Sequence, residues 1–328
     1  MVLVVVEQAV GSVSDLSLQA LTLARPLASG RPLHALLFGP GGHEAANALG
    51  AHGVGIAHVA EHGALADPRT LFAPDAWARI LGDLADRLEA TAVVAAGSER
   101  GNDVMARLAA RSGLPLAANC IAAAAGPPVA VTRLRWGGSL LEEAVLHAPR
   151  ALLTSAPHAV TAEPVAEAEA VATAVEPFTP DLDDADLVCR AREQVAAAGT
   201  GVSLAEAKVV VSGGRGVGSA EGFRVIEELA GLLGGAVGCS RAVTSAGWRP
   251  HTDQVGQTGT KIAPELYIPC GISGATQHMA GCRGAGKILA INADPEAPIM
   301  AGADYAVIGD LLEIVPAISA EIRRLRGV

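Results

Sequence analysis

The stretch KVVVSGGRGVG, residues 208–218, joins a short run of apolar residues to a glycine-rich turn. Apolar residues at helical spacing follow over residues 219–233. A strand, a tight turn and a helix in this order begin a βαβ unit, in which the flanking strands are parallel. The stretch therefore predicts an α/β fold built on a parallel sheet.

The same alternation continues through the rest of the chain. Further short apolar runs lie at residues 236–239, 266–269, 287–291 and 305–308, and helical patterns lie at residues 273–280 and 311–325. Five strands with intervening helices predict a doubly wound domain over residues 200–328. We expect this domain to be smaller than the one that precedes it.

A first α/β domain is predicted over residues 1–195. Its apolar runs lie at residues 3–6, 33–38, 91–96, 129–132 and 151–154, with helical patterns such as residues 17–27 and 77–88 between them. The chain is therefore predicted to be α/β with two domains, each a largely parallel doubly wound sheet.

Residues 163–193 differ in composition from the rest of the first domain. They hold nine carboxylates, only two arginines and three prolines. Stretches of this kind usually run over the surface, which predicts a solvated acidic connector. Attraction of a basic partner surface is the alternative role. The domain boundary should fall near residue 195.

Composition and charge exclude several classes of function. The formal net charge of -10 argues against sequence-independent binding of nucleic acid, which relies on Lys and Arg. The five cysteines show no CxxC pair or zinc-like spacing, which favours free thiols in a reducing compartment and no metal site. Because no apolar run reaches the roughly 20 residues of a membrane helix and no basic leader is visible, we expect a cytoplasmic chain without membrane insertion.

Small or polar residues follow all five predicted strands of the second domain. They are Ser212 to Gly216, Ser240 with Arg241, Gly271 with Ser273 and Gly274, Asn292, and Gly309 with Asp310. Ligands of open parallel sheets bind beyond the carboxyl ends of the strands. These residues therefore predict a polar binding edge for a large ligand.

Each of these segments, taken alone, has an ordinary structural explanation. The turn at residues 212–218 could approach a phosphate beside Arg215, but it matches neither the dinucleotide fingerprint nor the Walker A spacing. The loop QVGQTG, residues 254–259, suits a ligand contact and a solvated loop about equally. His278 alone would be a hydrogen-bonded structural histidine.

Taken together, the segments resemble a known family. PELYI at residues 264–268, GISGATQH at 271–278 and AIN at 290–292 resemble the signature of the electron transfer flavoprotein alpha subunit. Residues 212–216, 240–241, 255–259, 294–298 and 303–305 resemble the family pattern in the same order. The resemblance covers nearly all of residues 203–328 and is thinner before residue 160. It implies that the second domain binds FAD and that the first serves as a subunit interface.

The resemblance also implies which residues contact FAD. They are Arg215, Ser240, Arg241, Val255, Gly256, Gln257, Thr258, Ser273, Gly274, Ala275, Thr276, Gln277, His278, Asn292, Asp310 and Leu311. The amides of residues 273–277 suit the pyrophosphate, and Asn292 and Asp310 suit adenosine or ribose hydroxyls. Arg241 and His278 are expected near N1 and the C2 carbonyl of the flavin, and Thr258 near N5. No residue is expected to be catalytic.

The implied function is that of an electron carrier in a heterodimer. A smaller beta subunit, carrying AMP or a second FAD, would complete the complex. Dehydrogenases such as the acyl-CoA dehydrogenases of fatty acid beta-oxidation would donate electrons, and a quinone oxidoreductase or another acceptor would take them. Three alternatives remain: an electron-bifurcating subunit that oxidises NADH, an FAD- or NAD-dependent oxidoreductase with its own substrate, and a structural subunit with a vestigial site.

Several positions depart from the family pattern, among them Cys270, which precedes the turn at residues 271–274. Thr244 and Ser245 stand where the family often has an acidic residue a few positions after Ser240 and Arg241. Thr260 stands where a lysine is expected, with Lys261 next to it. These changes bear on the flavin potential and on partner choice, and not on flavin binding itself.

Overall fold

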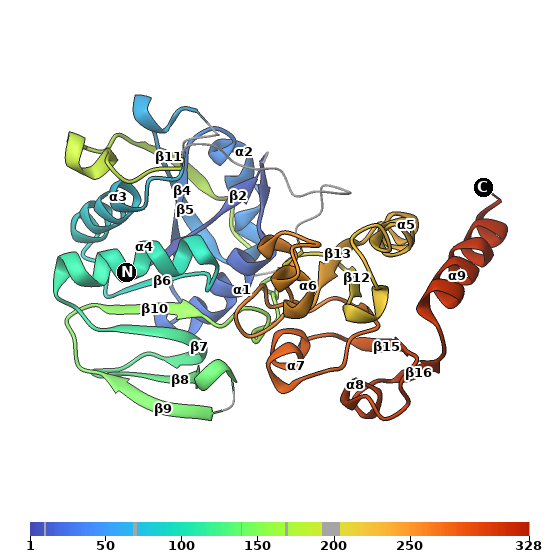
Figure 1. Ribbon diagram of the computed structural model, residues 1–328. Coiled ribbons are helices and arrows are strands. Elements are labelled where there is room, and N and C mark those ends of the chain that lie inside the picture. The colour runs from blue at the N-terminus through green and yellow to red at the C-terminus, as the bar shows by residue number, and fades with distance from the viewer. Residues whose placement is uncertain (10, 68–70, 139, 168–169, 192–203, 328) are drawn as a thin grey trace. The chain divides into compact units, whose positions relative to one another are not determined.

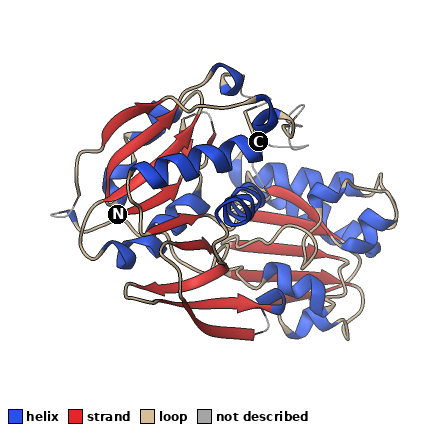
Figure 2. Ribbon diagram, turned by 90° about the vertical axis from the view of Figure 1, so that its left-hand side faces the viewer, coloured by secondary structure: helices blue, strands red, loops and turns tan. Residues whose placement is uncertain are grey.

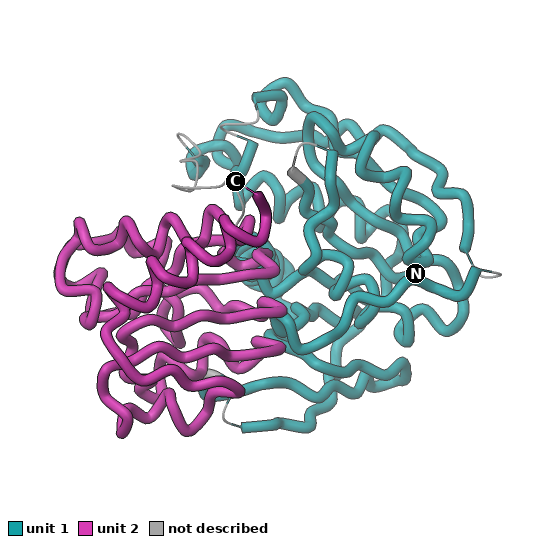
Figure 3. Tube along the Cα trace, turned by 90° about the vertical axis from the view of Figure 1, so that its right-hand side faces the viewer, with its two compact units in different colours: residues 1–194 teal, residues 195–328 magenta. Residues whose placement is uncertain are grey.

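The computed structural model describes residues 1–9, 11–67, 71–138, 140–167, 170–191 and 204–327. The chain forms two compact units, Met1–Gln194 and Val195–Val328 (Figure 3). The predicted boundary near residue 195 lies outside the described residues. Each unit is an α/β structure with helices on both faces of its sheet (Figure 2), which confirms the predicted fold class.

The first unit is built on a nine-stranded sheet with the order β11-β5-β4-β1-β6-β10-β7-β8-β9 (Figure 1). Neighbouring strands are parallel from β11 to β7, and the pairs β7–β8 and β8–β9 are antiparallel. The strands are β1 Val2–Val5, β4 Leu33–Phe38, β5 Val54–Ala60, β6 Ala92–Ala95, β7 Leu116–Ala124, β8 Val129–Arg135, β9 Leu140–Leu146, β10 Ala151–Ser155 and β11 Ala174–Phe178. A two-stranded sheet pairs β2 (Gln8–Ala9) with β3 (Ser12–Val13).

Helices cover the two faces of this sheet. One face packs on α1 (Asp15–Ala24) and α2 (Gly42–Ala46), and the other on α3 (Pro74–Arg87) and α4 (Glu99–Ser112). Both α1 and α4 begin at a serine whose hydroxyl accepts a hydrogen bond from a backbone amide of the first turn, Ser14 and Ser98. Short 3₁₀ turns lie at Arg25–Ala28, Leu49–His52, Gly63–Leu65, Trp136–Gly138 and Asp184–Leu187.

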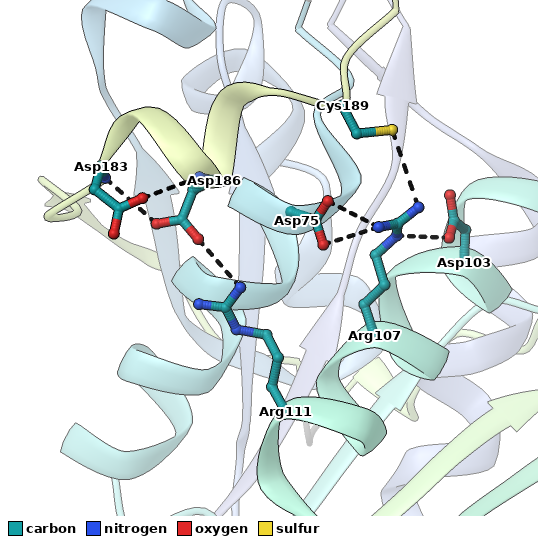
Figure 4. A network of polar contacts seen from close by, with 7 residues as sticks. All are labelled: Asp75, Asp103, Arg107, Arg111, Asp183, Asp186 and Cys189. Carbon is teal, nitrogen blue, oxygen red and sulfur yellow. Dashed lines mark hydrogen bonds and ion pairs between the residues drawn. The ribbon is translucent and has the colours of Figure 1, made fainter.

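The acidic connector differs from the prediction in two respects. Its residues Ala174–Phe178 form β11, the edge strand of the nine-stranded sheet, which pairs with β5. Asp186 in the turn Asp184–Leu187 is buried and forms an ion pair with Arg111 of α4 at 3.1 Å (Figure 4). The connector is therefore partly a packed component of the first unit.

A second arginine of α4 ties together neighbouring elements in the same network. Arg107 donates two hydrogen bonds of 2.8 Å to Asp75 of α3 and one of 2.9 Å to Asp103 of its own helix (Figure 4). Its Nη2 atom also lies 4.0 Å from the Sγ atom of Cys189. The network thus joins α3, α4 and the connector on one side of the sheet.

The second unit has five parallel strands in the order β13-β12-β14-β15-β16. They are β12 Val209–Gly213, β13 Ala236–Cys239, β14 Leu266–Cys270, β15 Lys287–Asn292 and β16 Tyr305–Ile308. The helices are α5 Phe223–Leu233, α6 Arg241–Ser245, α7 Thr276–Cys282, α8 Pro298–Ala301 and α9 Leu311–Arg326, with 3₁₀ turns at Arg215–Val217 and His251–Asp253. Helices α5 and α9 pack on one face, and α7 and α8 on the other.

This strand order places a topological switch point between β12 and β14, where the chain leaves in opposite directions. The loops that follow these two strands pack backbone against backbone. The amide of Gly214 donates to the carbonyl of Cys270 at 2.8 Å, and that of Gly216 donates to Gly271 at 3.2 Å. A Cβ atom on Gly214 would lie 2.1 Å from the Gly271 carbonyl oxygen, so the close contact requires glycine.

All five cysteines are free thiols. Four are buried, and burial raises the pKa of Cys120, Cys239 and Cys270 to about 12 and that of Cys282 to about 11. Within the described ranges, no cluster of His, Cys, Asp and Glu could hold a metal ion. The helices of the same ranges include none that is long and apolar enough to cross a membrane.

Candidate functional site

A pocket of about 460 Å³ lies beyond the carboxyl end of β13 in the second unit. Arg241, Thr244 and Ser245 of α6 line one part of it, since α6 begins directly after β13 and Ser240. The remaining lining residues are His251, Gln254 and Thr258. A volume of this size is in the usual range for small-molecule sites.

The lining combines one full positive charge with several hydrogen-bonding groups. Arg241 is exposed, and no described carboxylate forms an ion pair with it. Gln254 is 2% exposed and connects two hydroxyls. Thr244 Oγ1 donates to Gln254 Oε1 at 2.7 Å, and Gln254 Nε2 donates to Thr258 Oγ1 at 3.1 Å.

A buried arginine fixes the turn that carries His251. Arg249 contacts Asp253 through Nη2 at 2.7 Å and also forms an ion pair with Glu227 of α5. Its guanidinium lies over the ring of Phe223, 5.5 Å from the ring centre. The side chains of Arg249 and Asp253 are both 11% exposed, so the turn at His251–Asp253 is held by a largely desolvated pair.

The loop at residues 254–259 is joined to α7. The amide of Gln257 donates to the carbonyl of Gln277 at 2.7 Å. A Cβ atom on Gly281 would lie 2.4 Å from the backbone of Gly256, so these two segments are in direct backbone contact. The structure therefore brings together two of the predicted binding segments, residues 255–258 and residues 273–278.

His278 of α7 is buried, and burial lowers its pKa to about 4. Its Nε2 atom lies 2.7 Å from the hydroxyl of Tyr267. Its Nδ1 atom is buried, and no described atom forms a hydrogen bond of ordinary geometry with it. The backbone of Val255 raises the pKa of His278 slightly and so opposes part of the effect of burial. At neutral pH this imidazole is uncharged, so it can act as a donor or acceptor and not as a cation.

The start of α7 has open backbone amides. The helix begins at Thr276, and Ala275 before it provides no side-chain cap. Ser273, Thr276 and Gln277 are exposed. Gly274 has φ +81°, and a Cβ atom there would lie 2.5 Å from the amide of Ile299, so its role is to pack this loop against α8.

Several predicted contact residues have structural duties of their own. Asn292 donates to the carbonyl of Ile272 at 2.8 Å and accepts from the amide of Asp294 at 3.1 Å. Asp310 caps α9 by accepting from the amide of Leu312 at 2.8 Å. The side chains of Val255 and Leu311 are in the hydrophobic core. Any ligand contact by the last two would therefore come from the backbone.

Arg215 follows β12 and is exposed, and no described residue forms an ion pair with it. The glycines around it pack the β12 loop against the β14 loop, as described above. The Gly-rich turn thus packs the two loops together, and its Arg215 has no ion pair within the described part of the chain.

Two family models match most of the chain. Residues 2–182 match the electron transfer flavoprotein domain, and residues 203–283 match the electron transfer flavoprotein FAD-binding domain. The chain belongs to the electron transfer flavoprotein family. The second match confirms that FAD is the cofactor of this family's C-terminal domain, which contains the pocket.

Curated relatives place the chain among the alpha subunits of this family. It is 40% identical to the electron transfer flavoprotein subunit alpha of Mycobacterium tuberculosis over 99% of both chains. It is 33% identical to that of Thermoanaerobacterium thermosaccharolyticum, over 98% of this chain and 97% of the relative. The match to the Bacillus subtilis subunit is also 33%, over 96% and 95%.

The pocket residues of this alpha-subunit family member fit FAD. A ring system with polar carbonyls and ring nitrogens suits a lining of one guanidinium, hydroxyls and an amide. The exposed Arg215 offers the charge that a pyrophosphate requires.

Sequence reasoning missed several residues of the pocket. Thr244 and Ser245 were noted as departures from the family pattern and not as contacts, and His251 was not considered. Gln254 begins the predicted loop but was not expected to contact the cofactor. Its burial beside two threonine hydroxyls depends on the turn held by Arg249, and no local pattern indicates that arrangement.

Proposed function

We propose that this chain is the FAD-holding subunit of a heterodimeric electron carrier. It would accept electrons from dehydrogenases such as acyl-CoA dehydrogenases and pass them to a quinone oxidoreductase or another acceptor. The observation that carries the proposal is the pocket of the FAD-binding domain, which presents the hydroxyl of Thr258 and Arg241, for which no described carboxylate is an ion-pair partner. These groups suit holding and tuning a flavin ring.

In this proposal FAD supplies the reversible uptake and release of electrons, and the protein sets how readily they are taken up. Arg241 lies where its charge stabilises negative charge that develops on a ring in the pocket. His278 acts as an uncharged hydrogen-bonding partner, because its pKa of about 4 excludes the charged form at neutral pH. Thr258 would face a ring nitrogen of the bound cofactor, for which N5 is our candidate.

The rest of FAD would extend along the loops that follow the other strands. We propose that the open amides near Ser273 to Gln277 contact the pyrophosphate, together with Arg215. Asn292 and Asp310 would contact adenosine or ribose hydroxyls. Both side chains keep an oxygen with spare acceptor capacity after the internal hydrogen bonds described above.

The partner of this chain would be a beta subunit that carries AMP or a second FAD. The alpha-subunit names of the relatives support a heterodimer. A cytoplasmic location, a quinone oxidoreductase as acceptor and a role in fatty acid beta-oxidation remain predictions. The electron-bifurcating version, in which a second FAD takes electrons from NADH, remains the alternative within the family.

One experiment separates these versions. The chain is co-expressed with the candidate beta subunit, the FAD content of the purified complex is counted, and reduction by NADH and by an acyl-CoA dehydrogenase is followed by flavin absorbance. We expect one FAD, rapid reduction by the dehydrogenase and no response to NADH. Two FADs with NADH oxidation would show the bifurcating version, and a complex without flavin would contradict both.

A further inference from the structure

We propose that Thr244 and Gln254 are positioning residues that turn the Thr258 hydroxyl so that it donates its proton into the pocket. The three side chains form one chain of hydrogen bonds that ends at the pocket. This inference rests on the proposed position of the flavin ring against Thr258. It adds that the direction of the hydrogen bond at the ring is set by two neighbouring side chains of the pocket lining.

The two distances at Gln254 indicate which end of its amide faces which threonine. Hydroxyl-to-oxygen hydrogen bonds are typically about 2.7–2.8 Å long, and amide N–H to oxygen bonds about 2.9–3.0 Å. The contact to Thr244 is 2.7 Å and the contact to Thr258 is 3.1 Å. The carbonyl oxygen therefore faces Thr244 and the NH₂ group faces Thr258.

Thr244 has one hydroxyl proton and two acceptors within reach. The carbonyl of Arg241 lies 3.0 Å from Thr244 Oγ1, and Gln254 Oε1 lies 2.7 Å from it. The Thr244 proton lies in the contact to Gln254, because 2.7 Å is the usual length of a hydroxyl-to-oxygen hydrogen bond and 3.0 Å is longer than usual. Thr244 consequently holds the amide of Gln254 in the orientation given above.

Gln254 has little freedom to turn its amide over. The residue is 2% exposed, so water cannot replace either partner. Its backbone is also fixed, since its amide donates to His251 at 3.0 Å and its carbonyl accepts from Thr260 at 2.7 Å. Reversing the amide would place its NH₂ group against Thr244 Oγ1, and the Thr244 proton would then have only the longer contact, to the Arg241 carbonyl at 3.0 Å.

The hydroxyl of Thr258 then has a defined direction. Its oxygen accepts from Gln254, and among the described residues none accepts its proton. Thr258 is exposed and lines the pocket, so the proton is available to an acceptor atom of the ligand, such as an unprotonated ring nitrogen. A fixed donor stabilises negative charge on the atom it faces, which favours electron uptake without a proton at that atom.

A double-mutant cycle tests this chain of hydrogen bonds in the FAD-loaded complex. The midpoint potential and FAD content are measured for Thr244→Val in the natural background and in Thr258→Val. Thr244→Val should lower the potential in the natural background and have no effect in Thr258→Val. Thr244→Ser retains a hydroxyl and should restore the potential. Ser245→Ala removes another hydroxyl of the lining, and any shift it causes should be equal in both backgrounds.

Gln254→Glu is a second probe in case Thr244→Val does not accumulate. A carboxylate accepts from both threonines, so it should turn the Thr258 proton away from the pocket. Gln254→Glu should therefore lower the potential more in the natural background than in Thr258→Val, where only the added negative charge acts. Equal shifts in the two backgrounds, for either substitution, would overturn the proposed coupling while leaving FAD binding intact. If the complex without substitutions contained no FAD, that result would instead contradict the proposed function, so the two failures are distinguishable.

Discussion

Arg241 brings a full positive charge to the pocket, and no described carboxylate neutralises it. At this scale the function depends on a few side chains whose charge and direction are set by their neighbours. His278 is a case in which the neighbourhood changes the expectation. The sequence suggested a cation or strong donor, but burial keeps the imidazole neutral at physiological pH.

Arg241→Ala should lower the midpoint potential of the bound flavin, because the reduced ring loses a stabilising cation. A charge-assisted contact of about 1.5–3 kcal/mol corresponds to a decrease of roughly 60–130 mV for a one-electron step. The measurement is a reductive titration of the FAD-loaded complex. Arg224→Ala is the control, since Arg224 is an exposed arginine of α5 outside the pocket lining. An unchanged potential in Arg241→Ala would remove this residue from the role.

At the scale of elements, the site depends on how the loops after β12 and β14 pack together. Gly214 and Gly271 allow their backbones to touch at the switch point. This contact fixes the backbone of the β12 loop against that of the β14 loop, and Arg215 follows Gly214 in the first of these loops. The acidic connector of the first unit shows the same dependence on a few buried contacts.

Gly214→Ala should destabilise the second unit and reduce FAD content, because the new Cβ atom would lie 2.1 Å from the Gly271 carbonyl oxygen. Overpacking of this kind costs roughly 1–3 kcal/mol. Urea unfolding and FAD content of the purified complex are the measurements. Gly231→Ala in α5 is the matched control: nothing lies within 4 Å of its Cβ position. A helix interior should gain up to about 1 kcal/mol from that change. Equal behaviour of the two variants would contradict the packing argument.

Arg111→Ala should destabilise the first unit by roughly 1–3 kcal/mol, because it leaves the buried Asp186 carboxylate without its ion pair. Arg135→Ala is the control, since Arg135 pairs with Glu142 away from Asp186. The Arg111 and Arg135 side chains are 38% and 49% exposed, but the carboxylate partner is 3% exposed at Asp186 and 39% exposed at Glu142. The midpoint of urea unfolding should fall clearly for Arg111→Ala and little for Arg135→Ala. Similar decreases of the midpoint in both variants would contradict the prediction that burial of Asp186 makes its ion pair important for stability.

The pattern of elements was predictable from the sequence where strands are apolar and helices are amphipathic. The five strands of the second unit follow this rule. In the first unit β7 is rich in alanine and β9 contains Glu142 and Glu143, so neither has the composition of a typical strand. β11 contains Pro177, which argues against a central strand but is tolerated at the edge where β11 lies.

The candidate site was predictable to a similar degree. The strand-end residues indicate the edge of the sheet at which the pocket lies, because topology places the carboxyl ends of parallel strands together. The contact between Thr244 and Gln254 joins residues ten positions apart through a turn held by Arg249, Asp253 and Glu227. Such side-chain contacts depend on tertiary packing and not on local periodicity, so the sequence did not indicate them.

At the scale of the whole molecule, buried histidines link stability to pH in both units. In the first unit His34 and His58 lie 3.0 Å apart, and burial lowers the pKa of each. Glu176 opposes the shift at both, and Arg87 adds to it at His58. His278 in the second unit has its pKa lowered to about 4 for the same reason.

These shifts predict that stability falls as the pH decreases. An unfolded histidine takes up a proton near pH 6.5, whereas these folded ones resist it, so the unfolded state binds more protons below that pH. The loss should begin near pH 6.5, and His278 alone should account for roughly 2 kcal/mol by pH 5. Thermal unfolding between pH 7.5 and 5 measures it. His58→Gln should flatten the slope, whereas His147→Gln should not, because His147 is exposed and no described residue forms an ion pair with it. A stability independent of pH in this window would contradict the prediction.

The central claim is that the pocket beyond β13 holds the flavin ring of FAD between Arg241 and Thr258. An experimental structure of the FAD-loaded complex tests this most directly. We expect the ring inside the pocket, with the Thr258 hydroxyl within hydrogen-bonding distance of a ring nitrogen and Arg241 beside the ring. A flavin ring bound elsewhere, out of reach of both residues, would contradict it.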